Sequence, residues 1–148
     1  MSQVYELNTD IPAAYATDER RAIQEMAREF AMNEVLPIAN ELDPEKGIIP
    51  DDLRKKMGEL GFFGIMLPEE FGGLGLGVFE YCLVSEVLSR ALMSVASIIA
   101  RATFVGVGDL PIEDQDERLR QMARGEFLGS FAMSEPGAGT DILSIIHI

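Results

Sequence analysis

The stretch Phe131-Ala132-Met133-Ser134-Glu135-Pro136-Gly137-Ala138-Gly139-Thr140-Asp141 joins a short apolar run to a turn rich in glycine and hydroxyl groups. Phe131 to Ser134 is typical of a short strand, which Pro136 ends because proline cannot donate to a β-ladder. Glycine adopts positive φ and lets backbone N–H groups approach a ligand, so this turn is suited to hold an anion. The pattern predicts strand, tight turn and strand. On the residues alone, an ordinary hairpin turn is the more economical interpretation.

The composition is that of an acidic chain with enough apolar residues for a core. Its 148 residues correspond to one ordinary domain, and 47% of them are hydrophobic. The formal charge of −13 repels nucleic acid and anionic membrane surfaces, so we expect neither as a partner. The apolar stretch between Arg90 and Arg101 is too short to span a bilayer.

Reactive side chains are few in this sequence. Cys82 is the single cysteine and lies in an apolar run, so we expect it to be a buried small hydrophobe. A lone cysteine and the absence of an N-terminal secretion signal lead us to expect a reducing, cytoplasmic setting. The single histidine, His147, has no partner for a zinc site or a Ser-His-Asp arrangement. We therefore expect no metal site and assign no catalytic residue within the chain.

Hydrophobic periodicity predicts helices ahead of the glycine-rich stretch. From Thr17 the apolar residues follow the i, i+3, i+4, i+7 spacing of an amphipathic helix, with Gln24 facing water and Pro37 kinking or ending it. Further helices are expected over residues 50–60, 78–92, 95–107 and 114–124, the third of these four buried on most sides. Residues 62–67 are too apolar for a free loop and are expected to run through the core. The predicted fold is mostly α, a helical bundle with one short β-strand or hairpin at its C-terminal end.

Two motifs resemble the acyl-CoA dehydrogenase family. Residues 132–141, followed by Ser144, are similar to the first signature of that family without a gap. Leu67-Pro68-Glu69-Glu70-Phe71-Gly72-Gly73-Leu74-Gly75 resembles the loop between its early helices, in the family's order and spacing. The resemblance implies an N-terminal arm over residues 1–16, that family's N-terminal α-domain over 17–126, and the truncated start of its middle β-domain over 127–148. By the same resemblance, we expect the family's C-terminal catalytic domain to lie outside these 148 residues.

The resemblance also implies FAD as cofactor. In the family, the signature strand lies along the flavin, which places Phe131 and Met133 beside the isoalloxazine and Ser134 at its polar edge. Gly139 and Thr140 are implied to receive the pyrophosphate, and Thr140 also to reach the pantetheine of an acyl-CoA thioester. These groups orient a cofactor whose redox chemistry is its own.

Arg90 is a second candidate for substrate binding. In relatives that act on dicarboxylic acyl thioesters, an arginine at about this place reads the distal carboxylate of the substrate. From the residues alone, a solvated arginine at the end of a helix is the more economical interpretation of Arg90.

The function that the resemblance implies is α,β-dehydrogenation of an acyl-CoA, with hydride passing to flavin N5 and electrons to an electron-transfer flavoprotein. Such an oxidoreductase belongs to fatty acid metabolism. In the family, the catalytic base is a glutamate of the C-terminal domain. We therefore expect this fragment to be inactive alone. Whether the chain acts as an enzyme is left open. Two alternatives remain: a non-enzymatic helical module that binds an acyl thioester or a partner, and a relative of flavin monooxygenases or nitroalkane oxidases. Exposed apolar surface leaves a homo-oligomer open.

Overall fold

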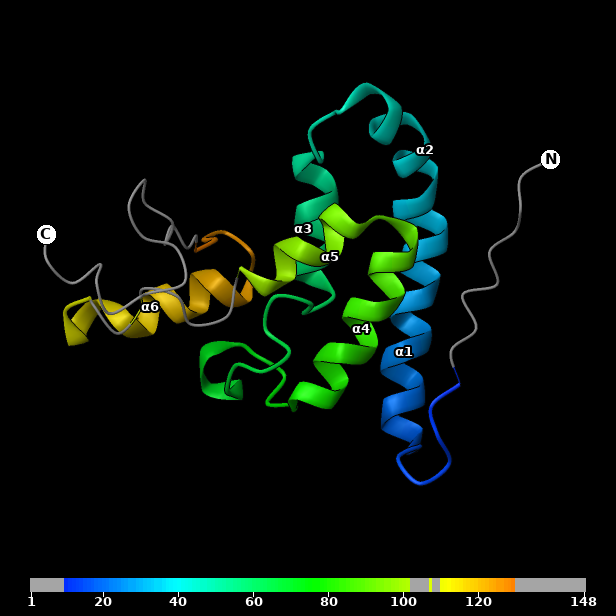
Figure 1. The fold of residues 1–148 in the computed structure, drawn as a ribbon. Coiled ribbons are helices and arrows are strands. Elements are labelled where there is room, and N and C mark those ends of the chain that lie inside the picture. Colours follow the sequence, from blue (N-terminus) through cyan, green and yellow to red (C-terminus); the bar gives the residue numbers. More distant parts are fainter. Residues whose placement is uncertain (1–9, 102–106, 108–109, 130–148) are drawn as a thin grey trace, which may run out of the picture.

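The computed structural model describes residues 10–101, 107 and 110–129, and their regular structure is helical (Figure 1). The elements are α1 (Asp18–Phe30), the π-helix η1 (Ala31–Val35), α2 (Leu36–Glu45), α3 (Asp51–Glu59), the 3₁₀-helix η2 (Glu69–Phe71), α4 (Val78–Ala91), α5 (Met93–Ala100) and α6 (Ile112–Ala123). The predicted mostly-α fold is confirmed. The strand or hairpin expected at the C-terminal end lies outside the described residues.

The first helix follows the sequence pattern, with one correction. Thr17 caps it, its hydroxyl accepting a hydrogen bond from the backbone N–H of Arg20 at 3.1 Å. The predicted apolar face is buried, namely Ile23, Ala27, Phe30, Ala31 and Val35. Gln24 is only 6% exposed, so the expectation that it faces water is wrong. Position 24 lies on the same face as positions 27 and 31, which makes the buried stripe wider than the apolar residues alone indicate.

Pro37 does not end this helix. The five residues of η1 form a π-helical turn, and α2 continues beyond it with Pro37 in its first turn. Proline is tolerated in the first turn of a helix because the N–H group that it lacks would have no intrahelical partner there. The π-helical turn before it changes the hydrogen-bond spacing of the backbone from i, i+4 to i, i+5. The proline is therefore accommodated beside a π-helical turn, and the helical backbone continues past it.

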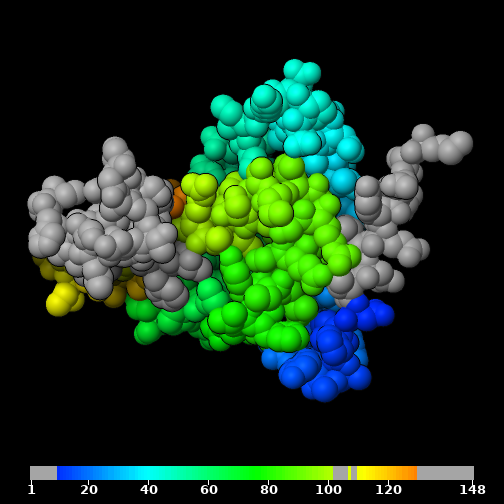
Figure 2. All heavy atoms as spheres, viewed as in Figure 1, coloured from blue at the N-terminus to red at the C-terminus, as the bar shows by residue number. Residues whose placement is uncertain are grey.

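The core lies between the first helix, α4, α5 and the segment that follows α3. Figure 1 shows α1 and α4 running side by side, and Figure 2 shows α5 and the end of α4 at the centre of one face. Extended backbone at Leu92 separates α4 from α5, in agreement with the two separate helices expected to meet between residues 92 and 95. Phe30 and Phe62 meet edge to face with ring centroids 5.5 Å apart.

Two burial expectations are wrong. Cys82 is exposed, because it lies four residues from both Val78 and Glu86, on the face of α4 that points away from the core. Of the helix expected over 95–107, the structure describes α5, which ends at Ala100 and buries only one side, while residues 102–106 lie outside the described residues. On its other side Met93 is 70% exposed, and Ser97 and Ala100 are exposed as well.

Residues 62–67 run through the core, and residues 68–76 fold back against them. Phe62, Phe63, Ile65 and Leu67 are each at most 3% exposed, as the apolar run predicts. Three carbonyl groups of this run accept hydrogen bonds from the returning half of the segment: the Leu74 N–H donates to Gly64 at 2.8 Å, Gly75 to Leu67 at 2.8 Å and Leu76 to Ile65 at 2.9 Å. The turn between the two halves carries η2, and α6 packs against it. Non-helical backbone is tolerated in the core because these bonds replace water.

Arg20 and Glu80 join the first turns of α1 and α4. Arg20 Nε donates to Glu80 Oε1 at 2.6 Å, and the Gly77 backbone N–H donates to Glu80 Oε2 at 3.0 Å. The guanidinium also lies 4.3 Å from the centroid of the Phe79 ring. The hydrogen bond from Arg20 is the main reason that the pKa of Glu80 lies below its ordinary value, ahead of the opposing effect of burial. Glu80 is only 7% exposed, so this ion pair fixes the helices against each other.

Replacing Gly73 by alanine is expected to destabilise the domain by about 3 kcal/mol. A Cβ at this position falls 2.1 Å from the carbonyl oxygen of Leu67, which is held by its bond to Gly75. Gly72→Ala is the matched control, since Gly72 has positive φ but open space, and we expect it to cost about 1 kcal/mol. Urea unfolding followed by circular dichroism measures both. If the two variants lose the same free energy of unfolding, the close approach of Gly73 to the Leu67 carbonyl is not a packing constraint.

Glu80→Gln is expected to lower the free energy of unfolding by about 2 kcal/mol at pH 7, since a charged hydrogen-bond pair is lost. Because the folded-state pKa of Glu80 is lowered, its stabilisation is present above the ordinary value of 4.5 and lost as pH falls through the folded pKa. The difference between wild type and variant should therefore shrink below pH 4.5. Glu29→Gln, at an exposed position of α1, is the control. If the difference in free energy of unfolding between wild type and Glu80→Gln stays constant from pH 7 down to acid unfolding, the stabilising role of the ion pair is contradicted.

Candidate functional site

The residues predicted to hold the cofactor fall outside the described part of the chain. These are Phe131, Met133, Ser134, Gly139 and Thr140, the last of which is also a predicted substrate contact. The structure therefore does not test their roles. It does describe the turn and the short segment, residues 124–129, that lead from α6 toward them.

The turn after α6 is held tightly at Gly125. This residue has φ +69°, and a Cβ added to it would lie 2.4 Å from the ring of Phe63. Glycine is required here both by the left-handed backbone and by the contact with the core. On the other side, Arg54 of α3 donates from Nη1 to the carbonyl oxygen of Gly125 at 2.7 Å.

The neighbouring backbone also lies directly against α3. A Cβ at Gly58 would fall 2.4 Å from the carbonyl oxygen of Arg124, so a larger residue in α3 would push the turn away. Arg124 itself points outward and bonds both carboxylate oxygens of Glu126, at 2.9 Å and 2.8 Å. That pairing lowers the pKa of Glu126 and raises the pKa of Arg124.

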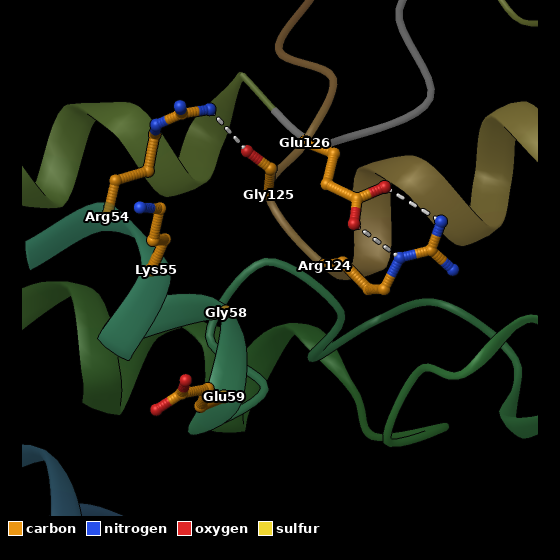
Figure 3. A pocket seen from close by; sticks show the side chains of 7 residues that line it. All are labelled: Arg54, Lys55, Gly58, Glu59, Arg124, Gly125 and Glu126. Carbon is orange, nitrogen blue, oxygen red and sulfur yellow. Dashed lines mark hydrogen bonds and ion pairs between the residues drawn. The ribbon is translucent and has the colours of Figure 1, made fainter. Parts of the chain in front are cut away.

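A pocket of about 650 Å³ lies between α3 and this turn (Figure 3). Its lining residues are Arg54, Lys55, Gly58, Glu59, Arg124, Gly125 and Glu126. Figure 3 shows Arg54 reaching from α3 to the Gly125 carbonyl, while the Arg124 guanidinium is turned toward Glu126. Of the cationic side chains in this pocket, Arg54 is the one that bonds the backbone of the turn.

The last described residues are anchored a second time. The backbone N–H of Gly129 donates to the carbonyl oxygen of Arg101, just beyond the end of α5, at 3.0 Å. Leu128 packs against the main core and Gly129 is buried. Phe131 follows only two residues later in the sequence. The last described residue, Gly129, is thus held against the helical domain beside α5.

Arg90 lies in the last turn of α4, partly exposed. Its Nη2 bonds Glu86 Oε1 at 3.0 Å, and its side chain is 38% exposed. It also lines a pocket of about 430 Å³ between α2 and the break at Leu92. Ser94, in the first turn of α5, lines the same pocket. The structure therefore shows an arginine that is both solvated and next to a hollow, which leaves its predicted role in substrate binding untested.

Sequence reasoning missed Arg54 and Gly58. On the helical pattern Arg54 is an ordinary charged residue of a short amphipathic helix, and its partner lies 71 positions further along the chain. The only signal in the sequence is Gly58, a helix-weakening residue next to the buried Met57. A glycine in such a place indicates close approach of another backbone, without saying which.

Within residues 10–101, 107 and 110–129, no cluster of three or more His, Cys, Asp or Glu side chains is suited to hold a metal ion. None of the described helices combines the length and apolarity needed to cross a bilayer.

Comparison with known proteins identifies relatives along most of the chain. The model of the acyl-CoA dehydrogenase N-terminal domain matches residues 17–126. Benzylmalonyl-CoA dehydrogenase of Aromatoleum aromaticum is 40% identical over 133 residues, which cover 87% of this chain and 35% of that protein. The chain therefore spans about a third of the length of such relatives.

Solved structures agree on the fold. That of a glutaryl-coenzyme A dehydrogenase with glutaryl-CoA superimposes with a TM-score of 0.79 at 26% identity, over 92% of this chain and 35% of that one. The structure of an acyl-CoA dehydrogenase from Bacillus anthracis in complex with FAD superimposes with a TM-score of 0.74 at 31% identity. The match covers 93% of this chain and 24% of that one.

Proposed function

The chain belongs to the acyl-CoA dehydrogenase family, and from this premise we propose that it is the N-terminal part of an FAD-dependent enzyme that dehydrogenates an acyl-CoA thioester. The observation that carries the proposal is the unbroken signature at residues 132–141, which begins three residues beyond the anchored Gly129 in the sequence. In this proposal residues 1–16 are an arm, 17–126 form the α-domain, and 127–148 begin the middle β-domain.

The chemistry of the signature suits a flavin. Ser134 and Thr140 offer hydroxyl groups, and Gly139 lets a backbone N–H come close to a phosphate oxygen. Phe131 and Met133 offer apolar surface of the kind that packs beside a flat ring. FAD, when bound, supplies the hydride acceptor, while these residues bind it and orient it.

The reaction needs a base, which we place outside these 148 residues. We assign no described carboxylate to this role: the buried one, Glu80, is committed to Arg20, and its lowered pKa makes it a weak base. The complete activity, the base and the electron-transfer flavoprotein that accepts the electrons therefore belong to the proposal for a longer protein.

One observation favours a dicarboxylic acyl thioester as the substrate. Arg90 lines a pocket, and two of the relatives above are named for acyl groups that carry a free carboxylate, benzylmalonyl-CoA and glutaryl-CoA. Arg90 is paired with Glu86 in the structure, but an exposed i, i+4 pair contributes only about 0.3–0.5 kcal/mol. Exchanging Glu86 for a substrate carboxylate therefore costs little, and a two-pronged pair with arginine is favourable.

FAD titration of the 148-residue chain, followed by flavin fluorescence, tests the cofactor proposal. We expect saturable binding that weakens at least ~10-fold when Ser134 and Thr140 are both changed to alanine, because their hydroxyl donors are lost. Ser97→Ala, an exposed serine of α5, is the control and should bind FAD like wild type. A helical chain that takes up no FAD would refute flavin binding by the chain and favour the alternative of a non-enzymatic module.

The substrate proposal is tested by calorimetry with glutaryl-CoA and butyryl-CoA on the FAD-loaded chain. We expect a ~10-fold preference for glutaryl-CoA that Arg90→Gln removes, since the distal carboxylate loses its charged partner. Arg101→Gln, an exposed arginine beyond the other end of α5, should leave the preference intact. Equal affinity of the wild-type chain for both thioesters would contradict a carboxylate-reading role.

A further inference from the structure

We propose that Arg54 is a positioning residue for the flavin-binding stretch, a role that rests on the FAD binding proposed above. Its guanidinium is itself held in place, because Nη2 bonds Asp51 Oδ1 at 3.1 Å one turn earlier in α3. Nη1 then donates to the Gly125 carbonyl at 2.7 Å in a partly buried setting. A charged donor in such surroundings forms a stronger bond than a neutral one.

The bond acts on a turn that has little other freedom. Gly125 rests on the Phe63 ring, and the carbonyl of Arg124 rests on Gly58 of α3. Packing therefore fixes the turn against displacement toward the core or toward α3. Arg54 supplies a charged hydrogen bond from α3 that opposes movement of the turn away from that helix.

The second anchor makes this local fixation relevant to the cofactor. Between the Gly125 carbonyl and the Gly129 N–H lie only three residues, of which Leu128 packs on the core. With both ends held, residues 125–129 are fixed against the helical domain, and they are the part of the chain that precedes Phe131 in the sequence. A binding stretch that starts from a fixed point loses less conformational entropy when its ligand binds, which increases affinity.

Lys55 provides a matched comparison within the same pocket. It is the next residue of α3 and also lines the hollow, yet it pairs only with Asp52, at 3.3 Å, and its side chain is 69% exposed. The structure thus distinguishes two neighbouring cations, one bonded to the turn and one facing water.

The test is FAD titration of the 148-residue chain and its Arg54→Ala, Arg54→Lys and Lys55→Ala variants, with helicity checked by circular dichroism. We expect FAD binding ~10-fold weaker in Arg54→Ala, an intermediate value in Arg54→Lys, and no more than a ~2-fold change in Lys55→Ala. Amide hydrogen exchange without FAD is the second readout. It should become ~10-fold faster at residues 127–129 in Arg54→Ala and stay unchanged in α1 and α4.

Each outcome decides between the two proposals. If wild type binds FAD and a folded Arg54→Ala binds it equally well, the positioning role is overturned while the proposed function stands. If wild type binds no FAD, the proposed function fails and this inference fails with it. If Arg54→Ala does not fold, Arg54→Lys decides: FAD affinity and amide exchange equal to wild type at residues 127–129 would overturn the special role of the guanidinium.

Discussion

A non-helical segment runs through the core of this domain, and its backbone polar groups have to be satisfied without water. Residues 62–76 meet that constraint by folding back on themselves, which brings Gly73 against the carbonyl of Leu67. The remaining structure depends on this arrangement. Phe62 packs on Phe30 of the first helix, and Phe63 forms the surface on which the Gly125 turn rests. Moving the segment would therefore disturb both the bundle and the exit from α6.

The same segment supports the turn that precedes the proposed cofactor-binding residues in the sequence. The turn after α6 is fixed by Phe63 from one side and by α3 from the other, and the chain is bound again at the end of α5. The loop motif at residues 67–75 is hydrogen-bonded to residues 64–67, and the neighbouring Phe63 supports the Gly125 turn. The signature at residues 132–141 follows this turn in the sequence.

Features that depend on local hydrophobic periodicity were predicted from the sequence, whereas features that depend on contacts between distant residues were missed. The apolar stripe of α1, the break at Leu92 and the burial of residues 62–67 all follow from periodicity and composition. The burial of Gln24 and the exposure of Cys82 were predicted wrongly, because each depends on which face of its helix meets a partner. The bond from Arg54 to Gly125 joins residues 71 positions apart, and no local signal indicates such a pair. For the cofactor residues beyond Gly129, the prediction rests on the motif and the family.

The central claim is that a fixed helical support and the family signature together make a flavin site. Equilibrium dialysis of the purified chain against FAD, read from the visible absorbance of the retained flavin, tests that claim most directly. The account predicts that a stoichiometric amount of flavin stays with the folded chain. A chain that circular dichroism shows to be helical, but that retains no flavin, would contradict it.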